Sequence, residues 1–194
     1  MPGGKASTAP ITNVVGFDDG PFLRVGGRRD VLLIGAVCAR TRLDGVLSGR
    51  VRRDGWNATA RMADLLLGSQ FAEHARAVLL GGIAVAGFNV VDIHTLADRL
   101  RRPVLVVMRR PPRYALIRQA LDRLRGGARR WRLIERAGPP EPVRGVLVQR
   151  SGLTLAQADA LLAATTLHGK LPEPLRLAHL IAGGVTTGRS RGRA

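Results

Sequence analysis

Three stretches of apolar positions, separated by polar links, open the chain and indicate β-strands. The first covers residues 11–17 and carries two acidic residues, Asp18 and Asp19, at its end. The second, residues 31–39, is almost wholly apolar, and the third, residues 44–52, alternates in part between apolar and polar positions. Strands joined by short links favour antiparallel pairing, so we predict an antiparallel three-stranded unit at the start of the fold.

After residue 56 the apolar positions recur at helical intervals, and helices alternate with short strands. Asn57 is expected to cap the first helix, and Thr154 with Gln157 three residues later forms a capping-box pattern for a later one. The predicted helices cover 57–71, 89–100, 113–125, a segment from 154 onward and 175–181, and the predicted strands lie within 75–86 and at 103–108, 131–135 and 146–149.

The order of these elements is typical of one fold class. Three antiparallel strands are followed by helix, strand, helix, strand and helix, which is the order of the ribonuclease H-like α/β proteins. By this analogy we predict a mixed five-stranded central sheet, with three antiparallel strands and then two parallel ones, flanked by helices. In that architecture the first strand is central and carries a catalytic acid.

The length of 194 residues predicts a single domain with two tails. We place a flexible tail at 1–10, the domain at 11–182 and a basic tail at 183–194. No apolar run approaches the roughly 18 residues of a membrane span, and residues 1–10 lack the apolar core of a signal peptide. The single cysteine, Cys38, lies in an apolar run and suits a reducing compartment, so we expect a cytoplasmic protein without a membrane partner.

The charge narrows the choice of partner. Thirty-one basic residues against 14 acidic ones give a formal net charge of +17, and only Lys5 and Lys170 of the basic residues are lysine. Arginine binds phosphate well, so an imbalance of this size favours a nucleic-acid partner. The alternative is a solvated arginine-rich surface of the kind that a GC-rich genome produces.

The acidic pair at the end of the first strand is a candidate metal site. Carboxylate oxygens suit magnesium, and successive strand side chains point to opposite faces, so only one of Asp18 and Asp19 is expected to face a given site. The alternative is a turn that happens to be acidic.

Five segments carry a family resemblance. The chain resembles endonuclease V, and it resembles more closely the related family called endonuclease dU, in GFDDGPF (16–22), DGVLSGRVRRDGWNAT (44–59), GGIAVAGFNVVD (81–92), PVLVVMRRPP (103–112) and LPEPLRLAHLIA (171–182). The resemblance implies an endonuclease that cleaves DNA or RNA near a deaminated base with magnesium or manganese held by acids.

The resemblance also implies roles for single residues. Asp18 matches the first metal-binding aspartate, and Asp54 is the nearest candidate for the second acid, after the third strand. Arg109 matches a basic residue that neutralises a phosphate, and His179 matches a position beside the metals. The third acid of endonuclease V is missing, because its place reads Gly81 here.

Two explanations of that missing acid stay open: Asp19 or Asp92 compensates for it, or the metal site is weaker. Two metal ions that activate water and stabilise the leaving oxygen need only a few carboxylates, so Asp18, Asp19 and Asp54 form the predicted metal-binding set.

A deaminated base must leave the base stack to be recognised. Phe88 is a candidate for stacking on the flipped base and Asn89 for hydrogen-bonding it; the alternative is that Phe88 is a core residue and Asn89 caps the following helix. Arg109, Arg110 and Arg113 are expected to contact phosphates.

We therefore expect a metal-dependent endonuclease of DNA repair that cleaves DNA at or near deaminated bases, with deoxyuridine preferred and RNA as an alternative substrate. The competing hypothesis is a nucleic-acid-binding protein of the same fold that is catalytically weak or inactive, which the glycine at position 81 motivates. The sequence leaves monomer and dimer equally open.

Overall fold

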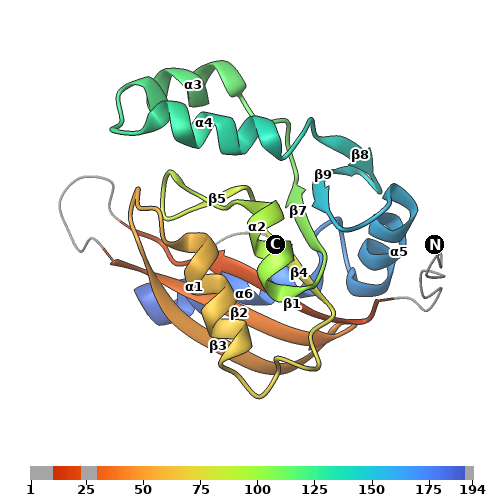
Figure 1. The fold of residues 1–194 in the computed structure, drawn as a ribbon. Coiled ribbons are helices and arrows are strands. Elements are labelled where there is room, and N and C mark those ends of the chain that lie inside the picture. Colours follow the sequence, from red (N-terminus) through yellow and green to blue (C-terminus); the bar gives the residue numbers. More distant parts are fainter. Residues whose placement is uncertain (1–10, 23–29, 191–194) are drawn as a thin grey trace.

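A seven-stranded mixed sheet forms the centre of the computed structural model, which describes residues 11–22 and 30–190 (Figure 1). The strand order is β3-β2-β1-β4-β7-β9-β8, and a separate hairpin pairs β5 with β6. The strands are β1 Asn13–Asp19, β2 Asp30–Ala39, β3 Arg42–Arg52, β4 Ala77–Leu80, β5 Ala84–Val85, β6 Asn89–Val90, β7 Val104–Met108, β8 Glu141–Val143 and β9 Val146–Ser151. The helices are α1 Ala58–Leu67, α2 Ile93–Leu100, α3 Tyr114–Asp122, α4 Gly127–Arg136, α5 Leu155–Thr165 and α6 Glu173–Thr187.

The direction of the strands decides which residues meet at each edge of the sheet. β1, β2 and β3 form the predicted antiparallel unit, in which Asp18 lies opposite Ile34. β4 and β7 run parallel to β1, with Phe17 beside Leu80. The carboxyl ends of β1, β4 and β7 therefore share one edge, and Asp18 and Asp19 lie there.

The alternation of side chains along β1 separates two cores. Val15 and Phe17 are fully buried with α1 and α2 on one face, and Val14 is buried with α5 and α6 on the other. Gly16 lets α6 lie directly on the strand, because a Cβ there would be 2.5 Å from the carbonyl carbon of Pro174. Two layers of helices thus cover the two faces of the sheet (Figure 1).

The helical hairpin α3–α4 stands away from the main sheet and packs on the β5–β6 hairpin (Figure 1). Val90, Leu121 and Ile134 are its buried core. Within the described ranges, no helix is long and apolar enough to cross a membrane.

The predicted sheet of five strands is too small. The prediction included 146–149, which is confirmed within β9, but it did not place that strand in the main sheet, where β9 pairs antiparallel with β7 and carries β8. The predicted strand at 131–135 is wrong, because these residues lie in α4. Their short apolar run forms part of the packed face of α4. The helix begins after Gly126, whose backbone is left-handed with a φ of 76°.

Several predicted boundaries move. The helix predicted from residue 89 begins at Ile93, because 89–90 form β6. Thr154 and Gln157 do form a capping box. The last helix runs to Thr187, so α6 includes the first residues of the predicted tail at 183–194. The predicted tail at 1–10 and residues 191–194 lie outside the described residues.

Candidate active site

Asp18, in β1, and His179, in the last helix α6, contact each other although they lie 161 residues apart. Asp18 points to the face of the sheet that α6 covers, and Nδ1 of His179 lies 2.8 Å from its Oδ2. The Asp18 side chain is 23% exposed and that of His179 is 49% exposed, so the pair lies at the rim of the site. The other ring nitrogen of His179 has no hydrogen-bond partner among the described residues. His179 can therefore orient Asp18 and still exchange a proton.

Asp19 points to the opposite face, as strand alternation predicts. Its Oδ2 accepts a hydrogen bond of 3.0 Å from the backbone N–H of Ala86, and its own N–H donates to Oδ1 of Asp18 at 3.0 Å. The two carboxylates are thus fixed by different parts of the fold although they are neighbours in sequence.

Burial perturbs both acids. It raises the pKa of Asp18, and the hydrogen bond and charge of His179 act in the opposite direction. Burial and the charge of Asp18 raise the pKa of Asp19 to about 6, against the hydrogen bond from Ala86. Two neighbouring carboxylates in a partly dehydrated place resist carrying charge together, and a bound cation relieves that repulsion.

Asp54 approaches the same loop from the end of β3. Its Oδ1 accepts a hydrogen bond of 2.8 Å from the N–H of Phe88, and its own N–H donates to the carbonyl of Ala86 at 2.9 Å. Asp54 and Ala86 both have left-handed backbones, with φ of 51° and 49°. The Ala86 peptide units therefore connect Asp19 with Asp54, through the N–H on one side and the carbonyl on the other.

Position 81 lies beside Asp18. A Cβ on Gly81 would be 3.6 Å from Oδ1 of Asp18, which is an ordinary contact distance, so an acid here would place its carboxylate next to Asp18. Asp92 does not replace it, because its carboxylate caps α2 at Thr95 and pairs with Arg136 at 3.0 Å.

The acidic side chains at this site can be compared with those that a magnesium ion requires. Within 11–22 and 30–190, no group of three or more histidine, cysteine or acidic side chains is arranged to hold an ion. Magnesium, however, binds through one or two carboxylates together with water and substrate phosphate. The half-buried carboxylates of Asp18 and Asp19, whose charges repel each other, can supply two such ligands.

A cavity of about 400 Å³ opens next to Asp54. Its lining combines one acid, one base and apolar side chains: Phe22, Arg53, Asp54, Gly87, Phe88, Ala120 and Leu124. Phe88 is half-buried: it packs against the small core of Val90, Leu121 and Ile134, as the alternative prediction expected, and it also lines this cavity.

The chain matches a known protein family over nearly its whole length. The model of the family described as endonuclease dU matches residues 10–186. The chain belongs to the endonuclease dU family. A UPF0215 protein of Deinococcus radiodurans is 55% identical over 184 residues, covering 94% of this chain and 93% of the relative. One from Methanothermobacter thermautotrophicus is 41% identical over 186 residues, covering 93% and 91%.

Solved structures extend the similarity. The crystal structure of a protein of unknown function from Archaeoglobus fulgidus matches with a TM-score of 0.84 at 30% identity, covering 91% of this chain and 99% of that one. Endonuclease V of Ciona intestinalis, in complex with a 24mer DNA containing an inosine followed by a ribo-adenosine, matches with a TM-score of 0.57 at 13% identity, covering 90% and 86%. The endonuclease dU family thus shares its fold with endonuclease V.

In this member of the endonuclease dU family, Asn89 is not placed to hydrogen-bond a flipped base, contrary to the role predicted for it from the sequence. Its side chain is fully buried. Its Oδ1 accepts from the N–H of Ala58 at 3.0 Å, and its Nδ2 donates to the carbonyl of Arg52 and to Oδ1 of Asn57, both at 2.9 Å. Asn89 therefore caps α1, the preceding helix, whereas Asn57 makes no side-chain cap there.

Arg130 was not singled out from the sequence, where it is one of two adjacent arginines, Arg129-Arg130, with no motif around them. Arg130 is only 2% exposed. Its guanidinium donates to the carbonyls of Phe88 at 2.8 Å, of Gly55 at 3.2 Å and of Asp54, and it lies 4.1 Å from the ring centroid of Trp56. Arg130 lies three residues after Gly127 and four before Ile134, so all three share the buried face of α4. Had this segment been predicted as a helix, that spacing would have indicated a buried Arg130.

The three arginines predicted to contact phosphate follow β7. Arg109, Arg110 and Arg113 are exposed. Arg109 and Arg110 come directly after β7, whose end shares an edge with that of β1, and Arg113 is the N-cap residue of α3. The endonuclease dU fold thus brings Asp18, Asp19 and His179 together and connects Asp54 to them through one loop. The arginines that follow β7 begin at the same edge of the sheet.

Proposed function

We propose that this protein is a metal-dependent endonuclease that cleaves DNA at or near a deaminated base, with deoxyuridine the preferred lesion, in DNA repair. The observation that carries the proposal is the Asp18–His179 contact at the end of the central strand, with Asp19 beside it. The net charge of +17 supports a polyanionic substrate. The order β3-β2-β1-β4-β7, antiparallel and then parallel, supports the ribonuclease H-like class.

Asp18 and Asp19 would hold Mg²⁺ or Mn²⁺ together with water and substrate phosphate, and Asp54 would complete the set only when ion and substrate are bound, because the described residues show no preformed group of three. The chemistry that such an ion supplies is activation of a water molecule and neutralisation of charge on the oxygens of the phosphodiester. The residues of the chain do the rest: His179 orients the Asp18 carboxylate and exchanges a proton, and the N–H of Ala86 fixes Asp19.

The cavity beside Asp54 is the site proposed for the flipped base. Phe88 provides the stacking face, and buried Asn89 acts through its hold on the segment that carries Phe88. Arg109, Arg110 and Arg113 neutralise the phosphates that follow the scissile bond along the edge of the sheet.

The decisive experiment is cleavage of labelled single- and double-stranded DNA, and of RNA, carrying uracil, hypoxanthine or no lesion, with magnesium or manganese. We expect lesion-dependent cutting by the wild type and by Asp98→Asn, which removes an exposed acid on α2. Asp18→Asn should bind the same DNA without cutting it. Full activity in Asp18→Asn would refute the role of this carboxylate.

The glycine at position 81 favours a second candidate, a nucleic-acid-binding protein without catalysis. It predicts salt-sensitive binding and no metal-dependent cleavage of any of these substrates. Turnover above that of Asp18→Asn eliminates it.

A further inference from the structure

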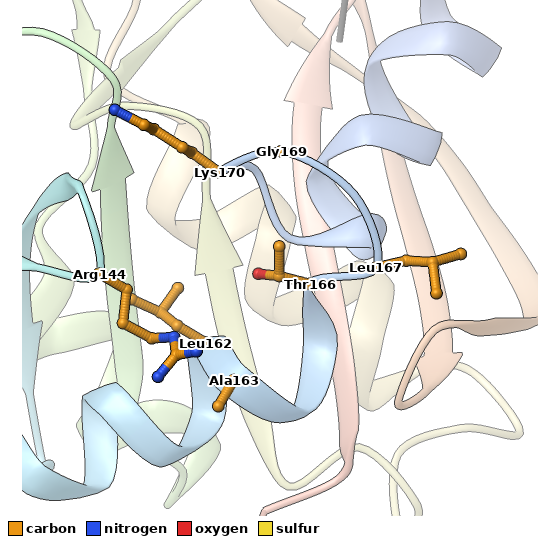
Figure 2. A pocket seen from close by; sticks show the side chains of 7 residues that line it. All are labelled: Arg144, Leu162, Ala163, Thr166, Leu167, Gly169 and Lys170. Atoms are coloured by element: carbon orange, nitrogen blue, oxygen red, sulfur yellow. The ribbon is translucent and has the colours of Figure 1, made fainter.

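A second cavity, of about 410 Å³, lies between the end of α5 and the β8–β9 turn. Its polar lining is basic: Arg144 comes from the turn and Lys170 from the segment that leads into α6. In Figure 2 the hydroxyl of Thr166 points toward the side on which these two side chains lie. Leu162 and Ala163 supply apolar wall. In Figure 2 the guanidinium of Arg144 lies beside this wall and the ammonium of Lys170 lies at the opposite end, so the two cations border the cavity from its two ends.

The fold leaves this positive charge largely uncompensated. Both basic side chains are exposed, and among the described residues no carboxylate pairs with Lys170. Arg144 pairs only with Asp159, at 3.6 Å and with both side chains about half exposed, a geometry that contributes little to stability. Lys170 lies against Gly145, since a Cβ there would be 3.2 Å from Cε of the lysine. Packing of its stem thus directs the ammonium group over the turn.

The topology puts this cavity on the edge that carries the active site. β9 is antiparallel to β7, with Leu147 opposite Met108, so the turn before β9 lies next to the residues that follow β7. Those residues are Arg109 and Arg110. In Figure 2 the ammonium end of Lys170 lies at the level of the tip of the neighbouring strand. The basic edge therefore continues past β7 to Arg144 and Lys170.

The separation suits a contact within one bound strand. From β1 to β9 there are three strand spacings, about 14 Å at about 4.8 Å each. Successive phosphates of one strand of B-DNA lie about 3.4 Å apart along the helix axis. A strand cleaved at Asp18 would reach the second cavity a few nucleotides away.

We propose that the cavity between Arg144 and Lys170 binds a backbone phosphate of the nucleic-acid substrate, a few nucleotides from the scissile bond, with the Thr166 hydroxyl as a further donor. The inference takes from the proposed function only that the ligand is a nucleic acid. It is tested by binding in EDTA, so a failure of cleavage and a failure of this contact are separate results.

The backbone supplies variants that preserve the fold. Arg144 has a left-handed φ of 48°, and so do Arg40 and Arg101, at 56° and 51°. Asparagine tolerates this conformation better than arginine does, so Arg→Asn is safe at all three positions. Arg40 follows β2 and Arg101 precedes β7, which places both on the opposite edge of the sheet.

The experiment compares Arg144→Asn/Lys170→Gln with Arg40→Asn/Arg101→Asn, each of which lowers the net charge by two, from +17 to +15. Binding to a labelled 24-nucleotide DNA is measured by fluorescence anisotropy over a range of salt concentrations. We expect the first double variant to raise Kd about tenfold and to reduce the salt slope by about one, the signature of one lost phosphate contact. The second should stay within about twofold of the wild type.

Equal losses in the two double variants would mean that only net charge matters, and would overturn the proposal. An unchanged Kd in Arg144→Asn/Lys170→Gln would overturn it as well. Thermal unfolding of both double variants is the check that each is folded.

Discussion

The carboxylate of Asp54 lies directly against the backbone of Gly87. A Cβ on Gly87 would be 2.4 Å from Oδ1 of Asp54, and the φ of Gly87 is 86°. Gly87→Ala should therefore displace Asp54, strain the loop by about 1–3 kcal/mol and reduce cleavage by at least tenfold. Gly138→Ala is the matched control, because Gly138 has a φ of 81° and nothing within 4 Å of its Cβ position.

The measurement is the cleavage rate at saturating metal, with the thermal midpoint of each variant. The two alanine variants should lose similar stability from the backbone alone, and only Gly87→Ala should lose activity. Similar activities in both would mean that Asp54 does not need its present position.

Asp19 makes the stability of the protein depend on pH. Burial and the charge of Asp18 raise its pKa from 3.8 to about 6, so the folded protein holds this proton more tightly than the unfolded chain does. Between these values the free energy of unfolding falls as pH rises, and the loss is complete above pH 6. Asp19→Asn removes the free-energy cost of keeping this carboxylate charged in the folded protein. It should therefore stabilise the protein at pH 7.5, by on the order of 2 kcal/mol, but not at pH 4.

The check is urea unfolding at pH 4 and pH 7.5 in EDTA, with Asp98→Asn as the control for an exposed acid. Added magnesium at pH 7.5 should then stabilise the wild type more than Asp19→Asn. An equal gain at both pH values would show that Asp19 carries its charge without cost.

The N-terminal half of the fold could be predicted because its signals are local. The apolar runs of β1, β2 and β3 each complete a strand, and the structure moves their ends by about two residues at most. The strand predicted at 131–135 failed because Trp131, Leu133 and Ile134 make a short apolar run that periodicity alone does not separate from a helix. The left-handed φ of Gly126, which lets α4 begin, is not visible in the sequence.

In the candidate site, too, residues with a local sequence signal could be predicted and residues defined by distant contacts could not. Asp18 could be found from its place at the end of a buried strand, but His179 lies 161 residues away and only family resemblance connected the two. Arg130 was missed because its partners are backbone carbonyls of Asp54, Gly55 and Phe88. Carbonyls carry no sequence signature, so a buried arginine that binds them reads like any surface arginine.

Arg130 should be more important to the site than its neighbour. Arg130→Lys keeps the charge but replaces a planar fork by a single ammonium, which leaves some of these carbonyls unpaired at about 1–3 kcal/mol. We expect a lower thermal midpoint and a higher KM, because the segments that carry Asp54 and Phe88 line one cavity. Arg129→Lys is the control: it also lies over Trp56, at 4.9 Å. Equal effects of the two substitutions would contradict this role.

Gly81 offers a direct test of the missing acid. A Cβ at this position meets only Asp18, at 3.6 Å from Oδ1, and the backbone is not left-handed, so Gly81→Asp should fold. The added carboxylate repels Asp18 in the absence of metal and shares a cation with it in the presence of metal. The expected signature is therefore a lower thermal midpoint in EDTA, a larger rise of that midpoint on adding magnesium, and cleavage at lower magnesium concentrations than the wild type needs. Gly81→Asn has nearly the same shape without the charge and should show none of the three. If both variants respond to magnesium as the wild type does, position 81 does not face the metal site.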